Sequence, residues 1–281
     1  MFDGTTENFG SSAPLADFLA AHRRLFVLTG AGISTASGIP DYRDLDGGWK
    51  RRPPVTYSAF VGDAATRARY WARSLIGWRR FGDARPNAAH DALARLENEG
   101  RVEALVTQNV DGLHQAAGSR EVIDLHGRLD EVRCLQCERR VARAAFQREL
   151  ETRNPAWSDL DALAAPDGDA DLDGLDFATF DVPACAACGG MLKPDVVFFG
   201  ENVPRARVEK AYAHLAAADA MLVVGSSLMV YSGFRFAREA ARAGKPVAAI
   251  NRGRTRADDL FALKIERDCA EVLQAVCQAA A

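Results

Sequence analysis

The stretch L-F-V-L-T at residues 25–29, followed at once by G-A-G-I-S-T at residues 30–35, decides how this chain folds. A short apolar run predicts a buried strand, and glycines directly after it predict a tight turn into a helix. Three more runs of strand length follow, at 101–107, 221–225 and 246–250. Continuous apolar strands of this kind are typical of a parallel sheet that is covered on both faces.

Helix-sized amphipathic segments lie between these runs, near 62–80, 87–99, 204–218 and 232–243. The alternation of strands and helices predicts an α/β fold with a doubly wound parallel sheet, similar to a Rossmann domain. Ligands of such a sheet bind beyond the carboxyl ends of its strands. Functional residues are therefore expected directly after the strands.

One segment interrupts this alternation and predicts a second structural unit. We assign 1–127 and 193–281 to the Rossmann-like domain, with a helical insertion near 44–85, and 128–192 to a small inserted module. The module carries an aspartate-rich stretch in which D-A-D-L-D-G at 169–174 imitates the start of a calcium loop. Because the glutamate required at loop position 12 is missing, we expect a solvated acidic loop.

The composition limits the class of protein. A chain of 281 residues with 48% hydrophobic and 26% charged residues is expected to be globular. A net charge of −3 gives no reason to expect binding to nucleic acid or to an anionic membrane. No apolar run approaches the roughly 20 residues of a membrane span, and the first residues resemble no targeting signal, so we expect a cytoplasmic protein.

Four of the six cysteines form two C-x-x-C pairs, namely Cys134 with Cys137 and Cys185 with Cys188. Each pair places two sulfur atoms at one corner of a tetrahedron, and two pairs complete a structural zinc site. A redox or disulfide role is the alternative, which a reducing compartment disfavours. The sequence therefore predicts one closed structural zinc in the small module.

The glycine turn after the first strand predicts a phosphate-binding loop only weakly. Glycines there let backbone N–H groups approach a pyrophosphate. The pattern departs from G-x-G-x-x-G, however, because Thr35 stands where the third glycine belongs. Taken alone, the motif fits a plain tight turn equally well. The following S-G-I-P-D-Y-R at 37–43 is suited to fold over a bound ligand.

Two further candidate groups follow predicted strands. T-Q-N-V-D-G-L-H at 107–114 offers donors and acceptors suited to a ribose and a carboxamide, although Asn109 or Asp111 could instead cap a helix. His126 follows a short run at 121–125 and precedes a glycine, which suits a general base. A structural role for His126 stays open, and His114 is its local rival.

Together, the motifs resemble the sirtuin family. The order G-A-G-I-S, S-G-I-P-D-Y-R, T-Q-N-V-D-G-L-H, L-H-G, two C-x-x-C pairs, K-P-D-V-V-F-F-G-E, G-S-S-L and N-R-G is similar to that family from about Leu25 to Cys277. The resemblance implies NAD-dependent removal of acyl groups from protein lysines, giving nicotinamide, deacylated lysine and O-acyl-ADP-ribose. It also implies that zinc has no chemical part in the reaction.

The resemblance assigns roles to individual residues. It implies that His126 is the catalytic base toward a ribose hydroxyl, with Asn109 and Asp111 beside it. The implied NAD contacts are Gly30, Ala31, Gly32 and Ser34 at the pyrophosphate; Ile39, Tyr42, Arg43, Asn109, Val110 and Asp111 around the nicotinamide and its ribose; Gln108 at the ribose; and Gly225, Ser226, Ser227, Asn251, Arg252, Gly253 and the Cys269 backbone at the adenosine half. The implied clasp around an extended substrate peptide consists of Val196, Val197, Phe198, Phe199, Gly200 and Glu201 on one side and Leu228, Val230 and Tyr231 on the other.

The acyl preference is a separate prediction. R-Y-W-A-R at 69–73 and the long insert between the cysteine pairs resemble the class II branch, which includes mitochondrial sirtuin four, in a bacterial member. The spacing of Tyr70 and Arg73 resembles the pair that meets carboxylated acyl groups, so we expect longer or carboxylated acyl groups to be preferred over acetyl. Alternatively, Tyr70 packs in the core and Arg73 pairs with an acidic neighbour.

Three other functions are alternatives to deacylation. Mono-ADP-ribosyl transfer would use the same NAD site. The departures from the dinucleotide motif argue against a dehydrogenase, and the complete cluster at 108–111 together with His126 argues against a module that only binds NAD. The expected partners are acyl-lysine proteins or peptides. The oligomeric state is not fixed by the sequence, and a monomer is the expectation.

Overall fold

The computed structural model describes residues 13–51, 53–158, 160 and 175–279, and the statements below concern these residues. The calcium-like motif at 169–174 lies outside them. All four predicted strands and all four predicted helices form, with ends that shift by one or two residues. The strands are β1 (Leu25–Thr29), β2 (Val102–Thr107), β3 (Val122–Asp124), β4 (Gly127–Cys134), β5 (Arg140–Ala142), β6 (Leu192–Val196), β7 (Ala220–Val224), β8 (Val247–Ile250) and β9 (Leu263–Ile265). The helices are α1 (Ala13–Ala21), α2 (Tyr57–Gly62), α3 (Ala64–Gly82), α4 (Ala88–Asn98), α5 (Leu113–Ala116), α6 (Arg143–Arg153), α7 (Pro155–Ser158), α8 (Arg205–Ala217), α9 (Tyr231–Arg242) and α10 (Cys269–Ala279).

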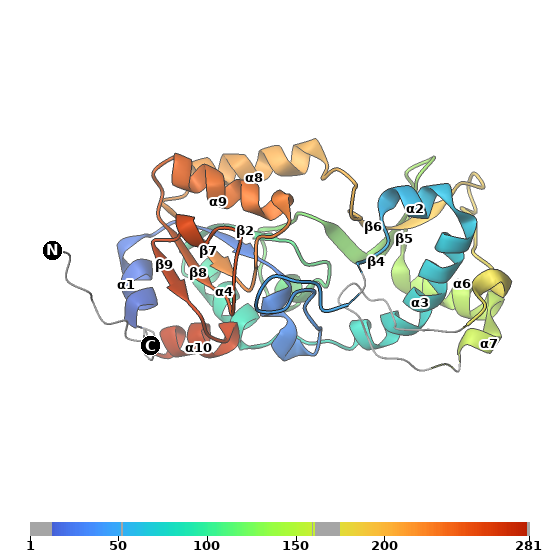
Figure 1. Cartoon of the computed structure of the whole chain (residues 1–281), viewed down its shortest axis with the longest axis horizontal. Helices are drawn as coiled ribbons and strands as arrows, with labels where there is room; N and C mark the ends of the chain where they lie inside the picture. Colours follow the sequence, from blue (N-terminus) through green and yellow to red (C-terminus); the bar gives the residue numbers. More distant parts are fainter. Residues whose placement is uncertain (1–12, 52, 159, 161–174, 280–281) are drawn as a thin grey trace.

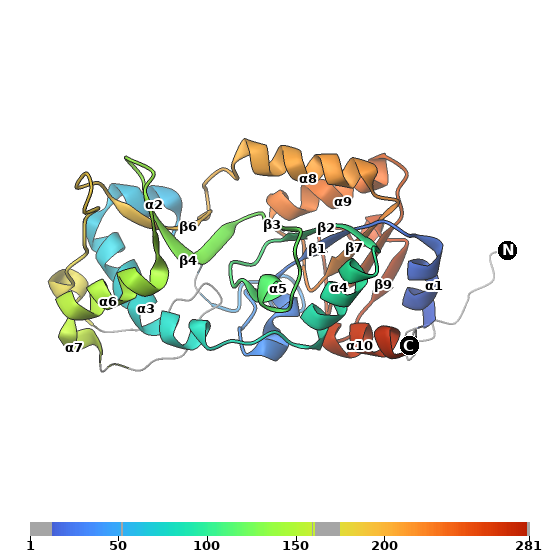
Figure 2. The same cartoon turned by 180° about the vertical axis from the view of Figure 1, so that it is seen from behind.

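Six strands form the main sheet in the order β3-β2-β1-β7-β8-β9, and each neighbouring pair is parallel. The predicted doubly wound parallel sheet is therefore confirmed. The order reverses between β1 and β7, because the chain runs outward from β1 to β3 and returns to the other side of β1 (Figures 1 and 2). Such a switch point opens a crevice at the carboxyl ends of the strands.

Helices cover both faces of this sheet, and alternate residues of β1 serve the two layers. Leu25 and Val27 pack in the cluster that includes α1, α4 and α10. Phe26 and Leu28 pack in the opposite cluster, which includes α8 and α9. Every residue of β1 is buried, which explains why its sequence is continuously apolar instead of alternating.

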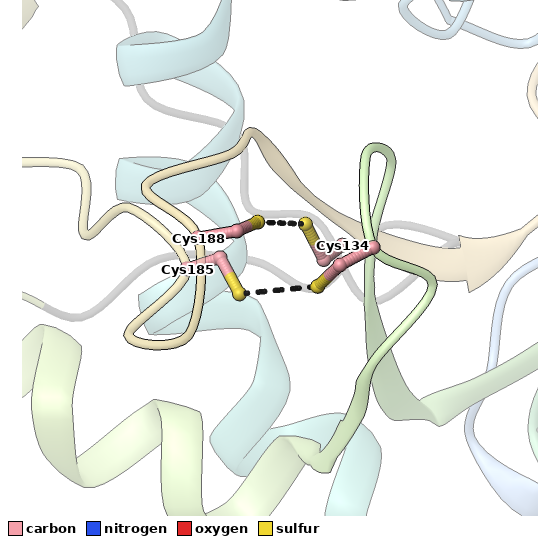
Figure 3. Close-up of side chains that lie close together, drawn as sticks. Cys134, Cys185 and Cys188 are labelled. Atoms are coloured by element: carbon pink, nitrogen blue, oxygen red, sulfur yellow. Dashed lines mark hydrogen bonds between the residues drawn. The ribbon is translucent and has the colours of Figure 1, made fainter.

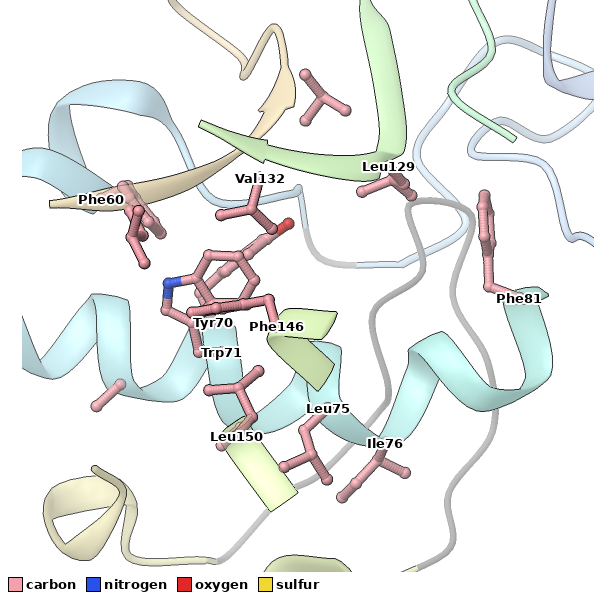
Figure 4. Packing of buried hydrophobic residues seen from close by; sticks show 14 of the residues in the cluster. Phe60, Tyr70, Trp71, Leu75, Ile76, Phe81, Leu129, Val132, Phe146 and Leu150 are labelled. Atoms are coloured by element: carbon pink, nitrogen blue, oxygen red, sulfur yellow. The ribbon is translucent and has the colours of Figure 1, made fainter. Parts of the chain in front are cut away.

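The small module is a three-stranded antiparallel sheet in the order β5-β4-β6, with its own hydrophobic core. Trp71 of α3 and Phe146 of α6 lie at the centre, with ring centroids 4.7 Å apart (Figure 4). Residues of α2 and α3 belong to this core, so the apolar face of the predicted helical insertion packs on the small sheet. The exact domain limits stay a prediction.

Gly127 joins the two units at a point where only glycine fits. Its φ of +82° lies in the left-handed region, and an added Cβ would stand 2.0 Å from the Asp195 carbonyl oxygen. The preceding residue, His126, accepts a hydrogen bond at its carbonyl oxygen from the Val197 N–H at 2.7 Å. The junction therefore places His126 between the main sheet and the segment that follows β6.

Candidate active site

One cavity of about 390 Å³ lies at the carboxyl ends of β1, β2 and β7. Most of the candidate residues line it. They are Gly30, Ala31, Gly32, Ser34, Ile39, Tyr42, Arg43, Tyr70, Gln108, Asn109, Val110, Asp111, His126, Val197, Phe198, Phe199, Gly200, Glu201, Gly225, Ser226, Ser227, Leu228, Val230, Tyr231, Asn251 and Arg252. Four other candidates, Arg73, Val196, Gly253 and Cys269, are not among the residues that line this cavity.

The glycine turn brings the ends of β1 and β7 into backbone contact. The Gly32 N–H donates to the Gly225 carbonyl oxygen at 2.8 Å. Gly225 has a φ of +61°, and an added Cβ would lie 2.2 Å from the Ile33 nitrogen. Close approach therefore favours glycine at both positions, since an added Cβ at Gly32 would lie 2.9 Å from the Gly225 carbonyl oxygen, and at Gly225 the backbone conformation adds to this. The predicted turn into a regular helix is wrong, since only the short 3₁₀ segments Ala31–Ile33 and Thr35–Ser37 follow β1. Gly38 and Pro40 come directly afterwards, and these residues disfavour continuation of a helix.

A polar cluster connects the glycine turn to the residues after β2. The Ser34 hydroxyl donates to the Asp111 carboxylate at 2.7 Å, and the Asn109 side-chain amide donates to Ser34 Oγ at 3.0 Å. The other Asp111 oxygen accepts from the Leu113 N–H at 2.9 Å. These side chains thus form one hydrogen-bonded cluster, and Asp111 also holds the start of α5 from the position before its N-cap, Gly112. Their role toward a ligand stays a prediction.

His126 is held by two hydrogen bonds that define its tautomer. Its Nδ1 atom lies 2.9 Å from the Gln108 carbonyl oxygen, and its Nε2 atom lies 2.8 Å from Ser232 Oγ. A carbonyl oxygen only accepts, so Nδ1 carries the proton and Nε2 accepts from the Ser232 hydroxyl. Burial lowers the pKa of His126 to about 4, against the opposing hydrogen bond to Gln108. The imidazole is therefore neutral at physiological pH, and its single acceptor nitrogen, Nε2, is occupied by the Ser232 hydroxyl.

The rival histidine, His114, is packed differently. Its side chain is 1% exposed, and its Nε2 atom lies 2.9 Å from Thr29 Oγ1 at the carboxyl end of β1. Burial lowers the pKa of His114 to about 3, and the nearby His90 ring adds to this. His114 is absent from the cavity lining, so its position fits a structural role.

Two residues of α9 that line the cavity were not predicted from the sequence, Ser232 and Arg235. They lie three residues apart on a helix and therefore share one face. Ser232 meets His126, whereas Gly233 allows α9 to approach Gln108, because an added Cβ would stand 2.7 Å from its side-chain amide. Their proximity to the G-S-S-L motif is the only sequence signal that could have identified them.

The segment after β6 is fixed by a buried ion pair. Lys193 Nζ lies 3.1 Å from the Glu201 carboxylate, and the same carboxylate accepts from the Phe198 N–H at 2.9 Å. Phe198 packs on Tyr70, with ring centroids 5.2 Å apart, and the Phe199 carbonyl oxygen accepts from the Tyr57 N–H at 2.9 Å. The segment 197–201 is thus a rigid wall of the cavity, anchored to the small module.

The four paired cysteines come together at one point of the small module (Figure 3). Their Sγ atoms all lie within 4.8 Å of one another, with 3.5 Å between Cys134 and Cys188 and 3.7 Å between Cys137 and Cys185. All six cysteines of the chain are free thiols, which argues against the disulfide alternative. A tetrahedral zinc with four thiolates requires sulfur atoms about 3.8 Å apart, so the cluster fits structural zinc. None of the four cysteines lines the cavity that contains His126.

Sequence comparison identifies relatives of the whole chain. The model of the Sir2 family matches residues 30–232. An NAD-dependent protein deacetylase of Xanthomonas campestris pv. campestris is 70% identical over 259 residues, which covers 92% of this chain and 88% of the relative. An NAD-dependent protein deacetylase of Bordetella bronchiseptica is 68% identical over 262 residues, covering 93% and 96%.

Solved structures show the same fold. A Sir2 protein bound to a p53 peptide and NAD⁺ has a TM-score of 0.74 at 31% identity, covering 96% of this chain and 98% of that chain. The protein Sir2Tm bound to a propionylated peptide has a TM-score of 0.74 at 32% identity, with the same coverage. Separately, none of the helices in the described part of the chain is long and apolar enough to cross a membrane.

Proposed function

Since this chain belongs to the Sir2 family and is an NAD-dependent protein deacetylase, we propose that His126 is its catalytic base. One observation carries the proposal. His126 lines the cavity with an unprotonated Nε2 atom beside Ser232, which also lines it, while the Gln108 carbonyl oxygen fixes Nδ1–H. A neutral imidazole with a fixed tautomer is prepared to accept a proton from a hydroxyl group.

The surrounding residues support a place for NAD on the sheet side of the cavity. The backbone around Gly30–Gly32 and Gly225–Ser227 would hold the pyrophosphate and the adenosine half, with Asn251 and Arg252 beyond β8. Ser34, Asn109 and Asp111 already form one hydrogen-bonded cluster next to that backbone. They would hold the nicotinamide and its ribose, since amide, hydroxyl and carboxylate groups can match both donors and acceptors.

The chemistry needs one proton transfer to the protein. The acyl oxygen of the substrate attacks the ribose carbon as nicotinamide leaves. His126 then accepts the proton of a ribose hydroxyl, which becomes the nucleophile toward the acyl carbon. Water completes the release of lysine and O-acyl-ADP-ribose. The Gln108 carbonyl stabilises the imidazolium that forms, because it accepts from Nδ1–H throughout.

The peptide is proposed to bind as an added strand between the segments 197–201 and 228–231. Both segments line the cavity that contains His126. The first is anchored by Glu201 and by the bridge between Thr56 and Phe199, so it offers a fixed backbone for β-type pairing. The acyl-lysine would then enter the cavity between the two segments.

Longer or carboxylated acyl groups are our proposed preference over acetyl. Tyr70 lines the inner part of the cavity and packs against Phe60 and Phe198, which supports an acyl pocket with an aromatic wall. Arg73 lies one turn further along α3, outside the cavity lining, so the carboxylated case is supported by the helical spacing alone. We further propose membership of the class II branch and a cytoplasmic location.

A panel of acyl-lysine peptides tests the acyl preference. The purified protein is mixed with NAD and acetyl, butyryl, octanoyl, succinyl and glutaryl peptides, and products are separated by mass spectrometry. Faster turnover of longer acyl groups supports the aromatic pocket, and loss of only the succinyl and glutaryl activity in Arg73→Ala supports the carboxylated case. Equal or faster acetyl turnover would contradict both.

Mono-ADP-ribosyl transfer is the alternative that the same NAD site permits. It would attach ADP-ribose to protein, whereas deacylation gives O-acyl-ADP-ribose in solution. Labelled NAD distinguishes the two reactions. Protein labelling at the rate of nicotinamide release, without deacylated peptide, would favour the transferase.

A further inference from the structure

Three arginines surround one exposed tyrosine at the start of α9. The Cζ atoms of Arg235, Arg238 and Arg256 lie 5.2, 5.3 and 5.8 Å from the Tyr231 ring centroid. Tyr231 is 44% exposed, and its neighbour Val230 is 36% exposed. We call these three arginines and Tyr231 the arginine platform.

No carboxylate of the described part of the chain forms a direct ion pair with the platform, although Glu239 acts on Arg238 electrostatically. The ion pairs found there include none with these three arginines. Arg238 donates to the Tyr231 hydroxyl at 2.6 Å, and Arg256 donates to the Met229 carbonyl oxygen at 3.4 Å. Both partners are uncharged. Hydrogen bonds of this kind hold guanidinium groups in place but leave their charge available.

The carboxylate nearest in sequence is already engaged. Glu239, the residue after Arg238, forms an ion pair with Arg242 at 2.6 Å on the same helix. Arg235 is oriented inward, and its Nε atom is buried without a hydrogen-bond acceptor among the described residues. Because this Nε atom has no contact with solvent, a peptide carboxylate would meet Arg235 through its terminal guanidinium nitrogens.

The platform continues into the cavity. Tyr231 and Arg235 line the same cavity as His126, together with Val230 of the proposed peptide clasp. Arg238 and Arg256 lie outside the cavity lining and contact the exposed side of Tyr231. A peptide that presents an acyl-lysine to His126 therefore leaves the clasp directly beside the three guanidinium groups.

We propose that the arginine platform selects protein substrates that carry aspartate or glutamate close to the acyl-lysine. Carboxylates match both the geometry and the charge of guanidinium groups, and the terminal nitrogens of Arg235 at the cavity provide a site for one of them. This inference rests on the proposed peptide clasp and names the class of substrate sequence that the clasp accepts. Acyl specificity is independent of it, because Tyr70 lies on another wall of the cavity.

Acetyl-lysine peptides with one flanking position at a time changed to aspartate, asparagine or lysine test the proposal. At the position that faces the platform, aspartate is expected to raise kcat/KM about fivefold over asparagine, and lysine to lower it. Arg238→Gln should reduce the ratio of aspartate to asparagine peptides, and Arg238→Glu should reverse the preference toward lysine. Arg95→Gln is the control, because Arg95 pairs with Glu99 on α4, which covers the opposite face of the main sheet from α9.

A second measurement separates this proposal from the proposed function. Fluorescence anisotropy of labelled acetyl-lysine peptides reports binding even if none of the peptides is turned over. Tighter binding of the aspartate peptide, weakened in Arg238→Gln and by added salt, supports the platform. Equal binding and equal turnover of aspartate, asparagine and lysine peptides at every position would overturn it, whatever the reaction proves to be.

Discussion

The Nε2 atom of His126 lies 2.8 Å from the Oγ atom of Ser232, and this contact joins the chain after β3 to the first turn of α9. Ser232 is 8% exposed, so the hydroxyl has little contact with solvent. The hydroxyl donates to the lone pair that a base needs. It therefore holds the ring in position while no substrate is bound, and a ribose hydroxyl must replace it when the base acts.

Replacement of Ser232 by alanine should disturb this arrangement without removing the base. Because a ribose hydroxyl must replace this bond before the base acts, its loss removes a resting-state interaction of about 1 kcal/mol, and kcat/KM is expected to rise up to about fivefold. The donated hydrogen bond favours the neutral ring, and its loss should also raise the pKa seen in the acid limb of the pH profile. Ser232→Thr keeps the hydroxyl and should keep that limb in place. An unchanged profile in Ser232→Ala would contradict the role.

The pH dependence of the native protein follows from the same site. Burial lowers the pKa of His126 to about 4, so the folded protein holds the base neutral well below the ordinary value for histidine. As the pH falls from neutral, kcat/KM should remain level to about pH 5 and then decrease as the ring gains its proton. The free energy of unfolding should decrease as the pH falls from about 6.5, the ordinary histidine value, to about 4, because over this range the unfolded histidine binds a proton and the folded one does not. An acid limb near the ordinary histidine pKa in the kcat/KM profile would show that His126 is not held in this way.

Gly233→Ala tests the close approach of α9 to Gln108. An added Cβ meets the end of the Gln108 side chain, which is flexible, so the helix should tolerate the methyl group. The Gln108 amide would move and lose the hydrogen bond at 2.6 Å from the Ser226 hydroxyl. We expect a KM for NAD raised about fivefold with a Tm close to wild type. Gly62→Ala is the matched control, because no atom lies within 4 Å of its added Cβ.

Removal of zinc should affect the small module first. Cys185→Ser removes one thiolate from the cluster, and Tm is expected to fall on the order of 10 °C, because metal binding contributes directly to folding. Cys277→Ser is the control, since Cys277 lies on α10 away from the cluster. Metal analysis should give one zinc per chain in the control and a loss of zinc in Cys185→Ser. Full zinc content in the Cys185 variant would contradict the assignment.

The sequence predicts the main fold well because its strands are continuously apolar and buried on both faces. The cysteine cluster is equally predictable, since two C-x-x-C pairs have few other uses in a reducing compartment. The glycine turn is predicted less well. The close backbone contacts of this turn are made with Gly225, which follows β7. That strand is about 190 residues away, so no local pattern identifies it as the neighbour.

The contacts of α9 show why the rest of the site cannot be predicted. Ser232 and Arg235 acquire their roles from long-range packing, because α9 approaches Gln108 only where Gly233 leaves space. Likewise, the spacing of Tyr70 and Arg73 suggests a joint role, yet α3 turns only Tyr70 toward the cavity. Spacing on a helix indicates that two residues are neighbours, but not which of them faces a ligand.

The central claim is that His126 accepts the proton that makes the ribose hydroxyl a nucleophile. The most direct test is incubation of wild type and His126→Ala with NAD and an acetyl-lysine peptide, with all products identified by mass spectrometry. Wild type is expected to release nicotinamide in an acyl-dependent manner, together with deacylated peptide and O-acetyl-ADP-ribose. The last two products should be lost in a variant that keeps its zinc and its folded circular dichroism spectrum. Formation of O-acetyl-ADP-ribose by His126→Ala at the wild-type rate would show that His126 is not the base.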